Sequence, residues 1–342
     1  MRKEQLPMSS NSNLTMAKNV KNDEFYTFMP DIEVELGNYE DYFRGKTVYC
    51  NCDDPERSNF WRYFYKRFDE LGLKGLISTH YTPGKPSYRL DVWRDVFTGR
   101  MLEPIQRNIL GDGDFRSEEC IRVLLEADVV VTNPPFSLFK EFVALLLREG
   151  KQFIVIGNMN IVSSKSIFRS LVDKELWLGH TQPKEFLMPN GQTKKFGNIV
   201  WYTNVDSPSR HQFLELSQTY APGKYLAYDN YDAINVNSIQ EIPGDYLGVM
   251  GVPLTFLLKQ CPDQFELLGI GSSKLFFTPI KQYIRPLRHN LDGTTTRQHI
   301  AVNNTLTIAL NEPPKGCYYC TADNTDKYLI SPYNRLLIQR KA

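Results

Sequence analysis

Residues 128–136 read Asp-Val-Val-Val-Thr-Asn-Pro-Pro-Phe, and this stretch decides the predicted fold. The uninterrupted β-branched run Val129–Val131 is typical of a strand buried on both faces, as in a parallel sheet. The two prolines after Asn133 end the hydrogen-bonding ladder, because proline has no backbone N–H. Ser137 can cap a following helix, whose apolar positions recur at helical spacing. A strand, a short loop and a helix place Asn-Pro-Pro-Phe at the carboxyl edge of an α/β sheet, where such sheets bind ligands.

This loop combines hydrogen-bond acceptors with an aromatic ring. The carbonyl groups of Asn133 and Pro134 lack ladder partners, and the Asn133 side chain adds an amide oxygen. Two such acceptors can take both N–H bonds of a planar exocyclic amine while Phe136 stacks on its heterocycle. Asn-Pro-Pro-Phe occurs by chance in roughly one chain of this length in a thousand. Our candidate catalytic residues are therefore Asn133, Pro134, Pro135 and Phe136.

The same tetrapeptide after a hydrophobic strand resembles the signature of amino-methyltransferases that use S-adenosylmethionine. Carboxylates at strand ends can hold the ammonium group or ribose hydroxyls of that cofactor, and a helix amino terminus adds N–H donors. Three stretches before the tetrapeptide offer such groups, although each also reads as an ordinary polar segment or capped turn. The candidate cofactor-binding residues are Tyr26, Thr27, Asn51, Asp53, Asp54, Asp114 and Phe115.

Strand and helix patterns alternate from Thr47 to Thr203 and predict a doubly wound, Rossmann-like α/β domain. Strands are expected over 47–52, 76–78, 129–131, 153–156 and 198–202, whereas 81–110 has no clear assignment. Beyond Asp206 the periodicity weakens, which predicts a separate, loop-rich α+β region. We therefore expect a flexible tail over 1–22, a catalytic domain over 23–205 and a target-recognition region over 206–342.

Composition indicates a soluble globular protein, with 42% hydrophobic and 23% charged residues in a chain of 342. The sequence shows no run long enough to span a membrane and no apolar signal-peptide core, so we expect a cytoplasmic protein. Cys317 and Cys320 have metal-ligand spacing, but the only second pair, Cys50 and Cys52, falls in a predicted strand. Buried thiols are the favoured interpretation, and we expect no metal.

Charge is distributed unevenly along the chain, although the net charge is only +1. Residues 271–342 hold ten Lys and Arg against four Asp and Glu, a balance of +6, so the first 270 residues carry −5. This asymmetry is compatible with a C-terminal segment that faces phosphate, and equally with a solvated basic surface. Arg285 and Arg288 are our candidate DNA-binding residues.

Taken together, these motifs are similar to those of the EcoRI-type adenine-specific DNA methyltransferases. The resemblance covers about residues 10–270 and includes the unusual Cys-Asn-Cys-Asp-Asp-Pro loop that begins at Cys50. It is carried by Asp23–Thr27, Val48–Pro55, Ser58–Phe60, Gly111–Ser117, Ala127–Phe139, Ile156–Asn160, Leu176–Gly179, Gly197–Asn204 and Gly251–Phe256.

The resemblance implies N6-methylation of adenine in double-stranded DNA, with S-adenosylmethionine as methyl donor and the target base flipped out of the helix. It implies action within a restriction-modification, phage or orphan modification system, with a cognate restriction endonuclease as a candidate partner. We expect a monomer. Alternatives are methylation of RNA adenine, methylation of a protein glutamine amide, and a non-catalytic DNA-binding protein with a methyltransferase fold.

Overall fold

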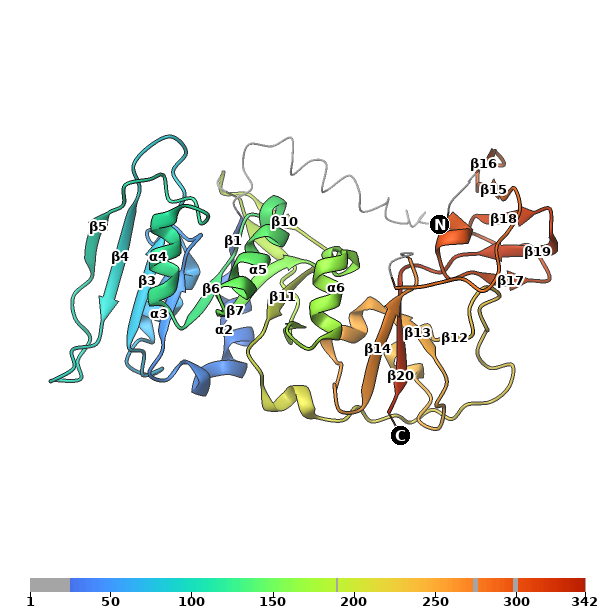
Figure 1. Cartoon of the computed structure of the whole chain (residues 1–342), viewed down its shortest axis with the longest axis horizontal. Helices are drawn as coiled ribbons and strands as arrows, with labels where there is room; N and C mark the ends of the chain where they lie inside the picture. Colours follow the sequence, from blue (N-terminus) through green and yellow to red (C-terminus); the bar gives the residue numbers. More distant parts are fainter. Residues whose placement is uncertain (1–24, 189, 273–275, 298–300, 342) are drawn as a thin grey trace, which may run out of the picture. The chain divides into compact units, whose positions relative to one another are not determined.

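The computed structural model describes residues 25–341 apart from 189, 273–275 and 298–300 (Figure 1). The described residues form two compact units. The first comprises those through Ile161 together with Leu176–Ser207, and the second comprises Val162–Glu175 together with the chain from Pro208 onward. The division between Ser207 and Pro208 lies close to the expected one after residue 205.

An eight-stranded sheet organises the first unit. In spatial order its strands are β5 (Ile105–Asn108), β4 (Tyr88–Trp93), β3 (Gly75–Thr79), β2 (Thr47–Cys50), β6 (Val129–Thr132), β7 (Gln152–Asn158), β11 (Ile199–Thr203) and β8 (Trp177–Leu178). The central strands β3, β2, β6 and β7 are parallel, and Val48 pairs with both Leu76 and Val129. The outer strands run antiparallel to their neighbours. The mixed α/β class is thus as predicted, and β4 and β5 account for the stretch left unassigned.

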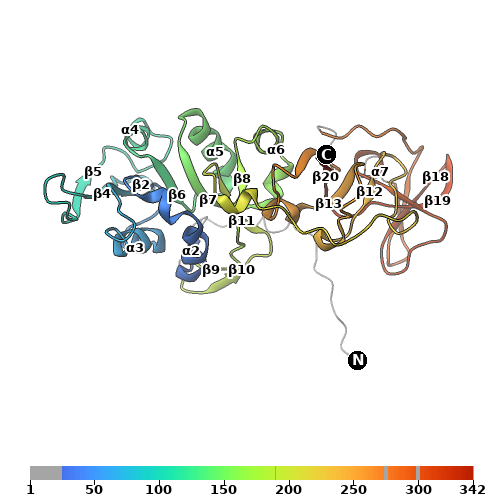
Figure 2. The same ribbon diagram turned by 90° about the horizontal axis from the view of Figure 1, so that it is seen from below.

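Helices cover both faces of this sheet, as Figure 2 shows. On one face lie α2 (Met29–Leu36), the 3-10 helix η1 (Gly37–Phe43) and α3 (Asn59–Lys66); on the other lie α4 (Glu118–Glu126) and α5 (Phe139–Arg148). Phe60 and Phe64 of α3 pack with Val48 and Val129 in one buried cluster, because residues four apart share a helix face. These strands are buried on both faces, which explains their continuous apolar sequence.

The start of α5 corrects one prediction. Ser137 does not cap the helix: it lies inside a 3-10 turn, η2 (Phe136–Leu138), and Leu138 holds the N-cap position without a side-chain hydrogen bond. The helix packs closely on β7, since a Cβ atom on Gly157 would lie 2.4 Å from the Phe139 ring. Glycine is therefore required there by close approach.

A second, smaller sheet in the first unit covers the aromatic cluster described below. Its strands are β1 (Tyr26–Thr27), β9 (Glu185–Leu187) and β10 (Thr193–Lys195), with β9 in the centre. Tyr26 pairs with Leu187 and Thr27 with Phe186, so the start of the described chain is tied to a segment far along the sequence.

The second unit contains two largely antiparallel sheets. One has the order β12 (Ile234–Asn235), β13 (Met250–Pro253), β20 (Arg335–Arg340), β14 (Phe265–Ile270); the other has β16 (Thr295–Arg297), β15 (Leu287–His289), β18 (Tyr319–Ala322), β19 (Thr325–Ile330), β17 (Ile308–Leu310). Its helices are α6 (Lys165–Val172) and α7 (Ala301–Asn304), and its 3-10 helices are η4 (Pro208–His211), η5 (Ile239–Glu241) and η6 (Leu254–Leu258). The boundary between the two units, between Ile161 and Val162, falls within a further 3-10 helix, η3 (Met159–Ser163).

Helix α6 departs from the expected domain boundary. The sequence places it in the catalytic domain, but it belongs to the second unit, where its Phe168 ring packs at a tilt against Phe276 with ring centroids 4.4 Å apart. Among the described residues, no helix is both long and apolar enough to cross a lipid bilayer.

A buried carboxylate on α2 connects this helix to the segment after β8. Glu35 accepts hydrogen bonds from the backbone N–H of His180 (3.0 Å) and from the backbone and hydroxyl of Thr181 (2.8 and 2.7 Å). We expect Glu35→Ala to lower the free energy of unfolding by about 1–3 kcal/mol, because donors of His180, Thr181 and Tyr39 lose their acceptor. Urea denaturation measures the change. Glu33→Ala, on the exposed face of α2, serves as the control and should shift stability by less than about 0.5 kcal/mol; equal effects would contradict this role.

Candidate active site at the switch point of the sheet

The order of the strands brings two loops of the chain together. From β2 the chain moves outward through β3, β4 and β5, and it then returns to the other side of β2 as β6. Between two parallel strands whose connections leave in opposite directions, the loops at their carboxyl ends leave a crevice where ligands bind. The loop after β2 carries Asn51–Pro55, and the loop after β6 carries Asn133–Phe136.

Asp53 joins these two loops through its buried carboxylate. It accepts hydrogen bonds from the hydroxyl of Thr132, at the end of β6, and from Ser58 Oγ (2.7 Å). Thr132 Oγ1 in turn accepts from the backbone N–H of Cys52 (3.2 Å). Ser58 also caps α3, since its hydroxyl accepts from the N–H of Phe60 (3.0 Å). One carboxylate thus fixes β2, β6 and the start of α3 relative to one another.

Burial raises the pKa of Asp53 to about 6. The hydrogen bonds from Thr132, Ser58 and the backbone N–H of Asn133 act in the opposite direction, because they favour the ionised carboxylate. The repulsion between Asp53 and the neighbouring Asp54 adds to the increase in the pKa. Asp53 is only 7% exposed, so its carboxylate is shielded from water and bonded to the two loops.

The shifted pKa of Asp53 makes stability depend on pH. The pKa of Asp53 in the folded state lies above the ordinary value of 3.8, so protonation of its carboxyl group stabilises the folded state. This stabilisation is complete below pH 4 and is lost as pH rises through 6. Asp53→Asn lacks the titrating carboxyl group. The difference between its free energy of unfolding and that of the parent should therefore shift in favour of the variant by up to about 3 kcal/mol between pH 4 and 7. Urea denaturation at four pH values tests this, with Asp41→Asn at an exposed position as the control. Parallel pH profiles of parent and Asp53→Asn would refute it.

The two ends of the Asn133 side-chain amide differ in their hydrogen bonding. Its Nδ2 donates a hydrogen bond to the carbonyl oxygen of Phe25. Its Oδ1 is buried and has no hydrogen-bond partner among the described residues. An unsatisfied buried acceptor costs free energy, and a ligand with an N–H donor would satisfy it. The geometry leaves this oxygen available to an incoming N–H donor.

Phe136 lies in an aromatic cluster rather than on an open surface. Its ring stacks on Phe25, with centroids 5.5 Å apart and 25° between the planes. The edges of Phe186 and Phe196 contact it at 6.4 Å. Phe136 is 8% exposed, so the face expected to receive a heterocycle is covered in this structure. Pro134 is buried and Pro135 half-buried, and the Pro135 carbonyl accepts from Leu138 N–H in the η2 turn (3.0 Å).

Four of the predicted cofactor residues lie around this crevice. Asn51 is buried, and its carbonyl accepts from the hydroxyl of Thr79 (3.3 Å). The Asp54 carboxylate is partly exposed and accepts from the N–H of Glu56 (3.0 Å). Tyr26 and Thr27 form β1, and Asn59 at the start of α3 donates to the Thr27 carbonyl (2.8 Å).

The hydroxyl of Thr27 is a second unsatisfied group in this region. Thr27 is 3% exposed, and its Oγ1 has no hydrogen-bond partner within the described part of the chain. Together with the partly exposed carboxylate of Asp54, it supplies polar atoms that a ribose or an ammonium group could engage. The residues at the carboxyl ends of β1 and β2 therefore fit a polar cofactor.

Asp114 and Phe115 are differently placed from the prediction. Asp114 lies near the loop after β2, because its charge helps to raise the pKa of the Cys52 thiol, for which burial is the main cause. Its carboxylate is paired with the guanidinium of Arg116 (2.6 Å), which holds the pKa of Asp114 below its usual range. Phe115 is buried against Phe142, with centroids 5.0 Å apart. Phe115 thus belongs to the core, and a ligand would compete with Arg116 for Asp114.

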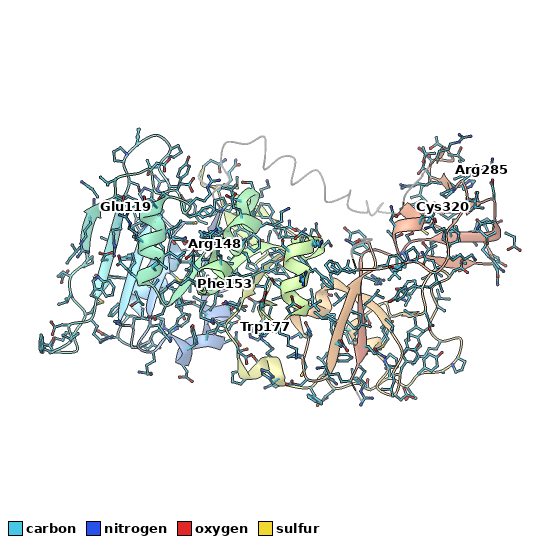
Figure 3. The ribbon with its side chains drawn as sticks, viewed as in Figure 1. Glu119, Arg148, Phe153, Trp177, Arg285 and Cys320 are labelled. Carbon is cyan, nitrogen blue, oxygen red and sulfur yellow. The ribbon has the colours of Figure 1, made fainter. Side chains whose placement is uncertain are left out.

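The predicted DNA-binding residues lie in the second unit, and Figure 3 labels one of them, Arg285. Arg285 is exposed and pairs with Asp323 (2.6 Å). Arg288 lies on β15 with its guanidinium 3.8 Å above the ring of Tyr318, and its Nε has no hydrogen-bond partner among the described residues. A stacked guanidinium keeps its in-plane N–H groups oriented, which suits recognition of an oxyanion.

The cysteines do not form a paired set. Cys317 is exposed, Cys320 is buried in β18, and Cys50 lies in the core of the first unit. All six cysteines are free thiols, and no cluster of three metal-ligating side chains occurs in the described ranges.

Sequence reasoning missed the residues that position the site. Thr132 and Ser58 hold the Asp53 carboxylate, and Phe25 covers both Asn133 and Phe136. Ser58 carried a local signal, since it precedes a helical run with aromatic residues on one face. The roles of Thr132 and Phe25 depend on contacts between segments 79 and 108 residues apart, which no local pattern encodes.

Comparisons with known proteins give a consistent result. A family model described as the adenine-specific methyltransferase EcoRI matches residues 13–341, well past residue 270. The Type II methyltransferase M.EcoRI of Escherichia coli is 41% identical over 317 residues, covering 82% of this chain and 97% of that relative. The Type II methyltransferase M.MpnI of Mycoplasma pneumoniae is 41% identical over 273 residues, covering 74% and 83%. No solved structure gives a significant match.

Proposed function

The chain belongs to the EcoRI adenine-specific methyltransferase family, and from this premise we propose that it is a site-specific DNA adenine N6-methyltransferase. The methyl group comes from S-adenosylmethionine, and the adenine is flipped out of duplex DNA. The protein acts in the cytoplasm as part of a restriction-modification, phage or orphan modification system. The observation that supports the activity most directly is the buried Oδ1 of Asn133, which has no hydrogen-bond partner among the described residues and lies in the same loop as Phe136.

The unsatisfied acceptor suits the amine of adenine. Asn133 Oδ1 accepts one N–H bond of the N6 amine, and the carbonyl of Pro134 accepts the other. Holding both protons directs the nitrogen lone pair toward the methyl donor, and the two oxygen dipoles stabilise the positive charge that develops on nitrogen. Proximity and orientation supply much of the remaining acceleration. The adenine must leave the stack, because its N6 atom lies inside the base pair.

The cofactor is held by the neighbouring polar groups. Asp54, whose nearest cation is Arg57 at 3.9 Å, and the hydroxyl of Thr27 would engage its ammonium group and ribose hydroxyls, with Tyr26 and Asn51 close to them in sequence. Bound S-adenosylmethionine supplies an activated methyl group on sulfur. Asp53 acts indirectly, since its bonds to Thr132 and Ser58 keep the loops after β2 and β6 in register. The sheet is thus a Rossmann-like methyltransferase scaffold, and the second unit supplies target recognition.

Asn133→Ala should abolish most methyl transfer while leaving the fold intact. We expect a hundred- to thousandfold decrease in rate, the scale of removing one aligned hydrogen-bonding group from an active site. Thermal stability should change little, because the hydrogen bond to the Phe25 carbonyl is worth only about 1 kcal/mol. The assay follows transfer of a labelled methyl group to duplex DNA carrying the site identified by sequencing modified adenine in the expression host.

The control for this experiment is Asn108→Ala on the exposed edge strand β5. Calorimetry with S-adenosylmethionine should give similar affinities for the parent and both variants. Near-normal adenine methylation by Asn133→Ala would remove the main support for the activity, and methylation of RNA in preference to duplex DNA would reassign the substrate.

Arg285 and Arg288 are proposed to contact DNA phosphates. The double variant Arg285→Ala/Arg288→Ala should bind duplex DNA more weakly, and the slope of log affinity against log salt should decrease by about one unit for each arginine–phosphate pair that the variant removes. Fluorescence anisotropy at several salt concentrations measures both quantities. Arg122→Ala, which removes an exposed arginine from α4, is the matched control. A salt slope equal to that of the parent would place the DNA-binding surface elsewhere.

A further inference from the structure

Phe25 covers the face of Phe136 that the proposed chemistry requires. The two rings are nearly parallel, with centroids 5.5 Å apart, and each is 8% exposed. Stacked bases lie about 3.4 Å apart, so a base between two rings needs a separation of roughly 7 Å. The edges of Phe186 and Phe196 occupy the sides of Phe136. A purine therefore cannot stack on Phe136 while Phe25 remains in place.

Phe25 also closes the hydrogen-bonding part of the site. Its carbonyl oxygen accepts from Nδ2 of Asn133, which fixes the orientation of the amide. The opposite end of this amide, Oδ1, is buried without a partner among the described residues. The amide is therefore held with its acceptor oxygen on the side opposite the Phe25 carbonyl. The ring and the carbonyl of one residue restrict both parts of the site.

We propose that Phe25 is a plug that occupies the place of the target base until DNA delivers one. Its ring substitutes for adenine in the stack on Phe136, and the flipped adenine displaces it. This inference rests on the proposed function and names a residue that competes with the substrate base for the same site. The free energy needed to displace Phe25 is then part of the barrier to base flipping.

The surroundings of Phe25 allow such a displacement. It precedes β1, a strand of two residues whose one ladder in the described structure is with β9. Lys194 on β10 lies 5.9 Å from the centroid of the Phe25 ring, at the outer side of the aromatic cluster. Among the described residues, moving the Phe25 side chain and carbonyl breaks the hydrogen bond from Asn133 and the ring contacts with Phe136, Phe186 and Phe196, none of which belongs to the ladder of the eight-stranded sheet. The adenine that enters stacks on Phe136 in place of Phe25, and its amine donates an N–H to Asn133.

The rate of base flipping tests this proposal. Duplex DNA with 2-aminopurine at the target position is mixed with enzyme and S-adenosylmethionine in a stopped-flow instrument, and the fluorescence rise reports unstacking. Phe25→Ala should flip about five- to tenfold faster than the parent, the factor that corresponds to the removal of one aromatic pair. Phe25→Leu, which keeps apolar volume but removes the planar face, should change the rate in the same direction. Phe97→Ala is the control, since it removes an exposed phenylalanine ring outside the aromatic cluster.

An unchanged or slower flipping rate in both Phe25 variants would overturn the proposal, because Phe25 would then be a wall of the base pocket. The methylation assay on the parent separates this result from a failure of the proposed function. If the parent methylates adenine in duplex DNA, the activity stands whatever the Phe25 variants do.

A spectroscopic measurement on the intact chain avoids any dependence on folding of the variants. With 4-fluorophenylalanine at position 25, the fluorine resonance should shift when DNA containing the target site binds, since the ring leaves the Phe136 stack. DNA of the same length without the site should leave the resonance unchanged. A resonance that the target-site DNA leaves unchanged, as the control DNA does, would show that the Phe25 ring stays in place and would refute the proposal.

Discussion

The carboxylate of Asp53 is the constraint on which the candidate site depends. It lies between two parallel strands whose connections leave in opposite directions, and it is bound by hydroxyls from β6 and from the cap of α3. Without these bonds the loops after β2 and β6 would share an edge of the sheet but have no fixed relation. Burial raises its pKa, yet the surrounding donors stabilise the ionised form, which is the balance expected of a structural carboxylate.

The site built on this constraint is oriented but closed. Oδ1 of Asn133 has no partner within the described part of the chain, while Phe25 accepts from the other end of this amide and stacks on the Phe136 ring. An enzyme that acts on a flipped base has a reason for such an arrangement, because an exposed apolar pocket and an unsatisfied acceptor would be open to other ligands. The closed form keeps these groups apart from water until a base with the matching amine enters.

The second unit shows why a charge balance alone does not locate a DNA surface. Of the basic residues that give residues 271–342 their +6 balance, several stabilise the fold: Lys281 pairs with Asp229 (2.7 Å), and Lys341 donates to the Pro262 carbonyl (2.6 Å). Arg288 differs, because its guanidinium stacks on Tyr318 and retains an unsatisfied buried Nε among the described residues. A count of charges therefore says less about the role of each basic residue than its contacts do.

The sequence by itself determined the α/β class, the family and the position of Asn133–Phe136 at the carboxyl end of a buried strand, because these depend on local order: a β-branched run, two prolines and a helical repeat. Only the tertiary structure decided that Asp114 is paired with Arg116, that Phe115 is buried, that Ser137 lies in a 3-10 turn and that α6 joins the second unit. It also decided that Phe25 stacks on Phe136 and accepts a hydrogen bond from Asn133. Each of these outcomes arises from contacts between side chains that sequence periodicity does not specify, since burial and hydrogen bonding depend on which segments the sheet brings together.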